Sequence, residues 1–325
     1  MNEGALRDLT FSHRAARLAM AGVSTGVFDA LADTPRTSAE VAAACALSAR
    51  GAKALLDALA AIGLLERCGT AFVATPEVRR VLTEKGDRSR RHTVLHDLWH
   101  TGLWTRLEES LVSGAPVTDR SRDPFFTRPD VLARFFPNLA HTMVETSRDE
   151  APVFAAGLTL PARARVLDLG GGLGNFAQAI AAAHGDAEVV LFDQAPVIDA
   201  ASSAPRVELR AGDFLRDPLD PEGGGFDRVI LSRVLMGLDD VRAVELLERV
   251  RDVLRPHGAV DVLELRRGEG AAGRVAALLD VDMLLLTGGA VRSGEDLRAL
   301  LAAARLHPGR ERSLGALLLH IEARS

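Results

Sequence analysis

A glycine-rich run, Asp168–Gly174, constrains the fold of this chain more than any other feature. It follows the apolar residues Val166 and Leu167, which suit a parallel strand that is covered on both faces. Glycines adopt positive φ angles and let a ligand approach the backbone closely. A helical pattern starts at Phe176 and Ile180, so N–H groups at the helix start would face a nucleotide-like ligand. The run therefore predicts a strand, a tight turn and a helix, the opening unit of a doubly wound α/β sheet.

Two acidic residues follow later apolar segments in the pattern of a nucleoside site. Asp193 ends the expected strand Glu188–Asp193, about 20 residues past the glycine run, where an acid binds ribose hydroxyls. Asp213 and Phe214 form a pair that can hold an adenine amino group and stack on its ring, although Asp213 also suits a turn or helix cap. The pattern fits NAD and S-adenosylmethionine alike. Since the chain contains no tyrosine, the Ser-Tyr-Lys set of a dehydrogenase is excluded.

The order of these motifs resembles that of the small-molecule O-methyltransferases in the class I S-adenosylmethionine-dependent superfamily. The resemblance covers nearly all of the chain, and its motifs lie at Asp168–Gly174, Phe192–Asp193, Arg206–Phe214, Phe226–Ser232, Leu254–Gly258 and Asp282–Ser293. The resemblance implies a Rossmann-like α/β methyltransferase domain with a doubly wound sheet. It also implies an N-terminal, mostly helical winged-helix dimerisation domain, and S-adenosyl-L-methionine as the cofactor.

The same resemblance assigns expected roles to individual residues. The cofactor-binding set is Ser147, Asp168, Gly170, Gly172, Asp193, Gln194, Asp213, Phe214, Ser232 and Arg233. The substrate-binding set is Phe135, Met143, Met236 and Met283. For Met143, ordinary packing in the core is the alternative. Because the second set is apolar, and Leu238 and Leu286 extend it, the expected acceptor is a small and largely apolar molecule, such as an aromatic natural product.

The histidine that removes a proton in phenol-methylating members of this family is missing. Within the segment Ser232–Asp240, Met236 stands at its position. The family's supporting glutamate after the late glycine pair is missing as well, and Val291 stands there. A thioether does not accept a proton at neutral pH. The joint loss indicates chemistry that differs from the usual histidine-assisted reaction.

Several interpretations of this loss remain open. Methyl transfer can proceed by proximity and orientation alone, since alignment supplies roughly 7–11 kcal/mol of a barrier. Another side chain can act as the base, with His141 as the candidate. A non-methylating reaction such as hydroxylation is the third interpretation, because the resembling branch that tailors anthracycline polyketides includes a hydroxylase and shares the pattern of Gly288–Ser293. A catalytically inactive cofactor-binding protein is the last.

The chain is expected to have three regions: a dimerisation domain at residues 1–105, a helical linker and substrate lid at 106–160, and the cofactor-binding catalytic domain at 161–325. Two helical segments between Thr37 and Ala61 precede two short strands, which is the winged-helix order. The second of these helices offers only Arg50 and Lys53 to phosphates, so a homodimer is expected instead of a DNA complex. After a helix at Val241–Leu254, a turn at Arg255–Gly258 is expected to lead into a strand.

The composition of the chain restricts its expected partners, location and metal content. A net charge of −5 argues against a nucleic-acid partner. No apolar stretch reaches the length of a membrane span, and residues 1–10 lack the apolar segment of a signal peptide, so a cytoplasmic location is expected. The two cysteines do not make a zinc motif, and His96 and His100, one helical turn apart, have no third ligand nearby in sequence, so no metal site is expected.

Overall fold

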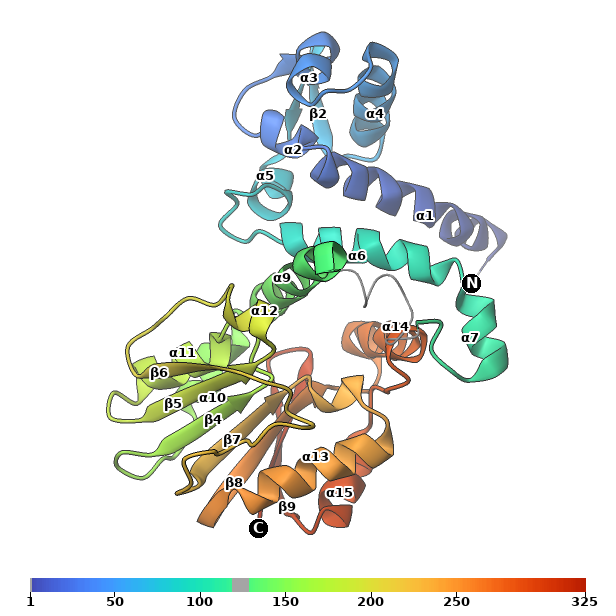
Figure 1. Ribbon diagram of the computed structural model, residues 1–325. Coiled ribbons are helices and arrows are strands. Elements are labelled where there is room, and N and C mark those ends of the chain that lie inside the picture. The colour runs from blue at the N-terminus through green and yellow to red at the C-terminus, as the bar shows by residue number, and fades with distance from the viewer. Residues whose placement is uncertain (1, 119–128) are drawn as a thin grey trace. The chain divides into compact units, whose positions relative to one another are not determined.

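The computed structural model describes the backbone of residues 2–118 and 129–325, and the side chains of residues 2–118 and 138–325. The chain divides into two compact units, Met1–Gly102 and Leu103–Ser325 (Figure 1). Each unit has a hydrophobic core of its own.

The first unit is mostly helical and contains a small antiparallel sheet. Its helices are α1 (Glu3–Ser24), α2 (Val27–Ala30), α3 (Ser38–Ala44), α4 (Ala49–Ala61), α5 (Pro76–Leu82) and α6 (Arg91–Trp104), which ends just past the unit. Its strands lie in the order β1 (Arg36–Thr37), β3 (Ala71–Ala74), β2 (Leu65–Cys68). Helices α3 and α4 followed by the β2–β3 hairpin make the winged helix that the sequence predicts.

Side-chain caps mark where several helices of this unit begin. The Thr37 hydroxyl accepts a hydrogen bond from the Glu40 backbone N–H, and the Glu40 carboxylate accepts one from the Thr37 backbone N–H, which is a capping box. The Ser48 hydroxyl accepts from the Gly51 N–H at 3.0 Å and starts α4. The apolar faces that these helices share bury Val23, Phe28, Leu56 and other apolar residues.

The second unit is built on a seven-stranded sheet in the order β6-β5-β4-β7-β8-β10-β9. The strands are β4 (Arg165–Leu169), β5 (Glu188–Asp193), β6 (Val207–Ala211), β7 (Phe226–Ser232), β8 (Leu254–Leu265), β9 (His307–Leu314) and β10 (Leu318–Arg324). The first five in this order are parallel, and β10 pairs antiparallel with both β8 and β9. Since β4 is followed by β5 on one side and flanked by β7 on the other, the carboxyl ends of β4 and β7 form the switch point where such sheets bind ligands.

Helices cover both faces of this sheet. The helices of this unit are α7 (Leu107–Ser113), α9 (Pro129–Ser147), α10 (Glu150–Ala156), α11 (Asn175–Ala183), α12 (Ala195–Ile198), α13 (Asp240–Asp252), α14 (Gly270–Leu286) and α15 (Gly294–Ala303), with the 3-10 turn η1 (Leu235–Gly237). On one face, Leu167 and Leu169 of β4 pack with residues of α13 and α15, which lie together beside β8 in Figure 1. On the other face, Val166 packs with Phe154 and Phe176 of α10 and α11. The sheet is therefore doubly wound, as predicted.

A buried ionic network crosses four strands of the sheet. Asp261 of β8 has no exposed surface, and it accepts hydrogen bonds from Arg228 of β7 at 3.2 Å and from His320 Nε2 of β10 at 2.7 Å. Arg312 of β9 donates its Nε–H to His320 Nδ1 at 3.0 Å. Because Nδ1 accepts, the histidine carries its proton on Nε2 and donates it to Asp261. Each buried charge in the network therefore has a partner, which burial requires.

The predicted turn at Arg255–Gly258 is wrong, because these residues belong to β8. Leu254 pairs with Phe226, after which the register shifts and Ala259 pairs with Arg228. The four residues form an irregularity within one long strand, and the positive φ of 68° at His257 bends the backbone there. A local proline–glycine pattern indicates a bend, but it does not show whether pairing continues on both sides.

Candidate cofactor and acceptor site

The glycine loop lies at the switch point of the sheet, between β4 and α11. Gly170, directly after β4, has a φ of 70°, and a Cβ built on it would lie 2.8 Å from the Val234 side chain. Gly172 has a φ of 63° with open space where its Cβ would be. A side chain at Gly170 would therefore be strained and would clash, whereas Gly172 keeps the backbone exposed to a ligand. The N–H groups that begin α11 lie at the same edge.

Asp193 at the end of β5 is tied to this loop. Its Oδ2 accepts a hydrogen bond from the Gly172 N–H at 2.8 Å, and its Oδ1 accepts from the Gln194 N–H at 2.7 Å. Burial raises the pKa of Asp193, while the two N–H donors oppose this by favouring the charged form. The Gln194 side chain is exposed beside it. The carboxylate thus fixes the loop and also stands at the mouth of the switch point.

Asp168 lies beneath the loop and is fully buried. Its Oδ2 accepts a hydrogen bond from the Ala177 N–H in the first turn of α11 at 2.9 Å. Its Oδ1 has no hydrogen-bond partner within the described part of the chain. Burial raises the pKa of Asp168 to about 7, the Ala177 N–H lowers it, and the charge of Asp193 raises it further.

Asp213 and Phe214 follow β6 on the far side of Asp193. Asp213 Oδ1 accepts from the Leu215 N–H at 2.9 Å, and the Asp213 N–H donates to Asp217 at 2.7 Å. The carboxylate therefore stabilises a turn, and it is also half-exposed. The Phe214 ring comes within 3.7 Å of the position that a Gly170 Cβ would occupy, so it lies beside the loop.

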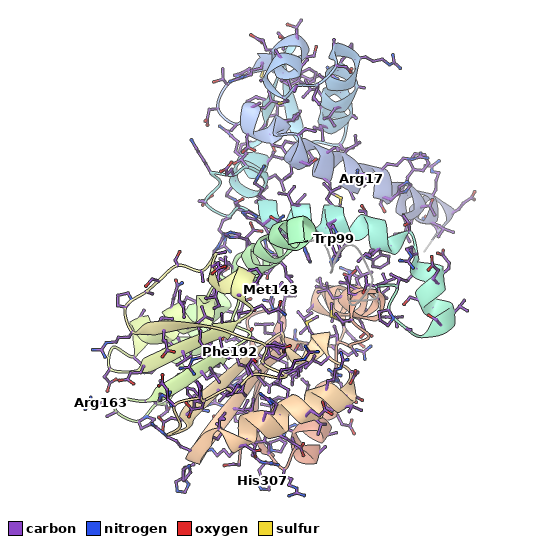
Figure 2. All side chains as sticks on the ribbon, viewed as in Figure 1. Arg17, Trp99, Met143, Arg163, Phe192 and His307 are labelled. Carbon is purple, nitrogen blue, oxygen red and sulfur yellow. The ribbon has the colours of Figure 1, made fainter. Side chains whose placement is uncertain are left out.

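The last two turns of α9 cover the glycine loop. A cavity of about 40 Å³ separates them, and its lining consists of Ala140, Met143, Val144, Ser147, Gly170, Gly171, Gly172, Leu173, Asn175, Phe176, Ser232 and Arg233. Figure 2 labels Met143 at the end of α9 that meets the sheet. Six of the predicted site residues thus come together around one cavity.

Hydrogen bonds hold α9 in this place. Asn175, the first residue of α11, donates its side-chain N–H to the Val144 carbonyl at 3.2 Å and to the Ser147 hydroxyl at 3.0 Å. Arg233, just past β7, donates to the hydroxyl and the carbonyl of Thr146 and lies 3.4 Å from the Met143 sulfur. The helix is therefore attached to both sides of the switch point.

The two positions from which the family's polar pair is missing lie in one apolar cluster. Met236 on η1 is 8% exposed and Val291 is 1% exposed. Both belong to a cluster with the buried Ala276 of α14, and Met283 packs against it. Gly289 lies directly on the Met236 carbonyl, since a Cβ on Gly289 would approach that oxygen to 2.1 Å. The region has the close packing of a core, and apolar side chains fill the base position.

Glu264 and Arg292 hold the η1 turn, and neither is among the site residues predicted from the sequence. Glu264, at the end of β8 and 2% exposed, accepts hydrogen bonds on Oε1 from the Leu235 and Met236 N–H groups. Burial raises its pKa to about 7 against the effect of these donors. Arg292 donates to the carbonyls of Leu235 and Leu238, each at 2.7 Å. An acid that ends an apolar strand was the available signal for Glu264, the same signal that marks Asp193.

His141 and Phe135 lie elsewhere on α9. His141 is half-buried, and the α9 residues that line the cavity are Ala140, Met143, Val144 and Ser147. It thus lies about 100° around the helix from Ala140 and about 60° from Val144, beside the lining face. The backbone of Phe135 belongs to α9, but its side chain lies outside the described residues.

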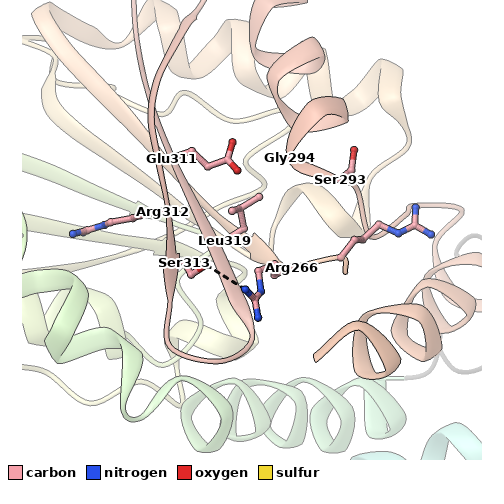
Figure 3. A pocket seen from close by; sticks show the side chains of 8 residues that line it. Arg266, Ser293, Gly294, Glu311, Arg312, Ser313 and Leu319 are labelled. Atoms are coloured by element: carbon pink, nitrogen blue, oxygen red, sulfur yellow. Dashed lines mark hydrogen bonds between the residues drawn. The ribbon is translucent and has the colours of Figure 1, made fainter. Parts of the chain in front are cut away.

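A larger cavity of about 420 Å³ shares no residue with this site (Figure 3). It lies between the start of α15 and the β9–β10 hairpin, and Arg266, Arg267, Glu311 and Arg312 line it. These charges have protein partners: Ser313 for Arg266, Asp280 for Arg267, Arg298 for Glu311 and His320 for Arg312.

Residues 2–118 and 129–325 contain neither a cluster of metal ligands nor a membrane-spanning helix. No three side chains of His, Cys, Asp or Glu gather there as ligands of a metal ion would. None of the helices in these ranges has the length and apolar content needed to span a bilayer.

Comparison with known proteins identifies the family. Residues 140–306 match the model of the O-methyltransferase domain, and residues 8–84 match that of the O-methyltransferase dimerisation domain. Acetylserotonin O-methyltransferase of Mus musculus molossinus is 34% identical over 92% of this chain and 82% of its own length. The mitomycin biosynthesis 6-O-methyltransferase of Streptomyces lavendulae is 28% identical over 97% and 92%.

A solved structure agrees with this assignment. A methyltransferase of calicheamicin biosynthesis, determined with SAH bound, superimposes with a TM-score of 0.76 at 26% identity, covering 100% of this chain and 99% of that one. The fold class, the dimerisation domain and the type of enzyme predicted from the sequence are thereby confirmed. The chain belongs to the O-methyltransferase family and is an S-adenosylmethionine-dependent methyltransferase.

Proposed function

We propose that this enzyme methylates a small, largely apolar acceptor, an aromatic natural product being the favoured class. The observation that carries the proposal is the cavity between the glycine loop and α9, where Met143 lies opposite Gly170 and Gly172. Apolar residues around Met236 and Met283 lie on the same face of the sheet. The relatives named for mitomycin and calicheamicin biosynthesis act in natural-product pathways, which supports this class of acceptor.

The residues at the switch point fit the cofactor. Asp168 Oδ1 is buried without a partner in the described structure, as expected of an oxygen that faces a cationic ligand. We assign the ribose hydroxyls to Asp193 and Gln194, the adenine to Asp213 and Phe214, and the amino-acid end to Ser147, Ser232 and Arg233 together with Gly170, Gly172 and Asp168. Asp213 also keeps its turn contacts in this assignment.

The mechanism follows from what these residues can do. S-adenosylmethionine supplies an electrophilic methyl group on a sulfonium. The chain's part is to orient the acceptor against it and to exclude water, which α9 does by covering the loop. Met236 and Val291 cannot take a proton. Proximity and orientation therefore carry the reaction, with roughly 7–11 kcal/mol available from alignment. An acceptor that ionises readily, or an amine or enol carbon, needs no base.

His141 remains the alternative base. It lies on α9 one position away from the lining face, so a rotation of its side chain or an acceptor that extends along α9 is required for contact. Replacement of His141 by Ala separates the two mechanisms. If the variant turns over more slowly and its pH–rate profile loses an inflection near neutral pH, the base is His141. Unchanged turnover supports proximity catalysis.

The apolar pair at positions 236 and 291 also favours a second candidate, a non-methylating reaction such as hydroxylation of the acceptor. Mass spectrometry of the product from aromatic acceptors decides between them. A gain of one methyl group with release of S-adenosylhomocysteine supports the methyltransferase. A gain of one oxygen supports the alternative, and no product from any acceptor class supports a catalytically inactive protein.

Two further properties belong to the proposal. We infer a homodimer formed through the N-terminal unit, because residues 8–84 match the dimerisation domain. Sedimentation that gives the mass of one chain at micromolar concentration would refute this. The expectations of a cytoplasmic location and of no nucleic-acid partner stay predictions.

A further inference from the structure

A carboxylate with an unused oxygen lies under the glycine loop. Asp168 has no exposed surface, and a Cβ on Gly171 would lie 2.5 Å from its Cγ, so the loop packs directly against it. One oxygen is used by the Ala177 N–H. The other has no hydrogen-bond partner within the described chain. A buried ionised oxygen without a donor is costly, and a cation nearby removes that cost.

From this arrangement we propose that Asp168 couples cofactor binding to release of a proton and makes the site prefer the sulfonium form over the spent thioether form. The inference rests on the proposed cofactor site. The step is an ionisation, in which the carboxyl loses its proton to solvent as the cation binds. S-adenosylmethionine carries both a sulfonium and an ammonium, whereas S-adenosylhomocysteine carries only the ammonium, so the methyl donor would favour the ionised carboxyl of Asp168 more strongly.

The charges that face Asp168 come from few elements. Asp193, from β5, adds a negative charge and disfavours ionisation of Asp168. From α11, the Ala177 N–H favours the ionised form. The neighbouring strand residues Leu191 and Ile230 are apolar. Arg233 lines the cavity above the loop, and its guanidinium donates to Thr146 on α9.

These surroundings place the titration of Asp168 in a useful range. Burial, with the charge of Asp193, raises its pKa to about 7. Near neutral pH the carboxyl is therefore divided between its two forms before the cofactor binds. An opposite charge within a few ångströms favours ionisation, so binding shifts the carboxyl toward its charged form. The full positive charge of the donor shifts it further than the product does.

Calorimetry tests the coupling without measuring turnover. We titrate the purified protein with S-adenosylmethionine at one pH in PIPES and in imidazole buffers, whose ionisation enthalpies differ, so the difference in heat counts the protons released. We expect about half a proton per site at pH 7, nearly one at pH 6, and a smaller number with S-adenosylhomocysteine. The ratio of the two dissociation constants should then change by about three- to tenfold between pH 6 and pH 8, in favour of the methyl donor at high pH.

Two variants assign the proton to a residue. Asp168→Asn keeps the size of the side chain and should bind the cofactor with no release of protons. Glu264→Gln is the matched comparison, because Glu264 is also fully buried at the end of a strand and also has its pKa raised to about 7. It should keep the release. Thermal unfolding checks that both variants are folded. If either variant does not fold, the comparison of S-adenosylmethionine with S-adenosylhomocysteine on the wild-type protein still tests the coupling.

The outcomes separate this inference from the proposed function. Binding of S-adenosylmethionine by the wild type with equal heats in both buffers overturns the coupling and leaves the cofactor site intact. Release that persists in Asp168→Asn, or that vanishes in Glu264→Gln, overturns its assignment to Asp168. Absence of any binding of S-adenosylmethionine overturns the proposed cofactor site itself.

Discussion

Glu264 holds Met236 by its backbone, with Oε1 accepting the Met236 N–H at 3.2 Å while the Met236 side chain packs into an apolar cluster. Arg292 holds the carbonyls on either side of the same turn. The position that carries the base in related phenol methyltransferases is thus fixed by two charged residues, although its own side chain is apolar. The residues that fix the backbone at position 236 are therefore separate from the side chain at that position.

The raised pKa of Glu264 predicts how stability changes with pH. Its pKa is about 7 in the folded chain against 4.5 for the unfolded one, so the folded state binds the proton more tightly. The free energy of unfolding therefore falls as pH rises from about 4.5 to about 7. The free energy of unfolding of Glu264→Gln should not fall in this way. Between pH 4.5 and pH 8 it should therefore rise relative to that of wild type by about 2–3 kcal/mol, as measured by urea unfolding.

A control of opposite sign is available for that measurement. Arg228 and Arg324 beside Glu322 hold the pKa of Glu322 below its usual value, against the effect of its burial. Its contribution is present at neutral pH and is lost as pH falls through the lowered folded pKa. Glu322→Gln should therefore lose stability relative to wild type at pH 8 and recover in acid. Parallel behaviour of the two variants would contradict both assignments.

Replacement of the buried Arg292 is expected to lower the free energy of unfolding considerably. It is 6% exposed and donates to the carbonyls of Leu235 and Leu238 and to the carboxylate of Asp240. Arg292→Met removes the charged donor from both carbonyls and leaves the Leu235 carbonyl with only the Leu238 N–H at 3.1 Å, which should cost about 2–4 kcal/mol of unfolding free energy. Arg242→Ala, which removes only an exposed pair with Asp239 at 3.7 Å, should cost less than about 1 kcal/mol. Equal losses would show that the turn does not depend on Arg292.

The contact between Arg233 and Thr146 is expected to slow amide hydrogen exchange in the last turn of α9. Thr146→Val removes the hydroxyl that accepts from Arg233 and keeps the shape of the side chain. Amides in the last turn of α9 should exchange with deuterium several-fold faster, because local opening needs less energy by about 0.5–1.5 kcal/mol. Thr142→Val on the same helix removes only a bond to the Asn138 carbonyl and is the control. Equal exchange in the two variants would exclude the contact as a determinant of helix position.

Substitutions at Met236 test whether its thioether takes part in the reaction. Met236→Leu conserves volume and apolarity, so turnover should stay within about threefold of wild type and stability within about 1.5 kcal/mol. Met236→His places an imidazole in the apolar cluster with Val291 and should cost about 1–3 kcal/mol. It should also introduce an inflection below about pH 6.5 in the rate on a weakly acidic phenol, because burial lowers the pKa of an imidazole. A loss of turnover above tenfold in Met236→Leu would give the sulfur a direct role.

Local sequence patterns were sufficient for the central part of the fold. The strand, glycine turn and helix around Gly170 follow from apolar runs and from positive φ angles, both of which depend on adjacent residues. The capping box of Thr37 and Glu40 is equally local. The strand boundary at Leu254 was not predictable, since the irregularity at residues 255–258 depends on pairing with β7.

The contacts that complete the candidate site lie beyond such patterns. Glu264 meets Met236 across 28 positions, and Arg233 meets Thr146 across 87. In sequence, Glu264 resembles any acid at a strand end, and only its burial separates it from surface acids. For the same reason, the sequence could place His141 on a helix but not on a particular side of the cavity.

The buried network around Asp261 has a consequence for the order in which the sheet can be assembled. His320 reaches Asp261 across 59 positions, and β10, which carries it, lies between β8 and β9. Strand β9 precedes β10 in the chain yet has no place in the sheet until β10 is inserted. The edge of β8 stays open meanwhile, with Asp261 lacking its histidine. Closing this side of the sheet therefore depends on a long-range contact, and a chain that folds without inserting β10 would leave the hydrogen-bonding edge of β8 exposed.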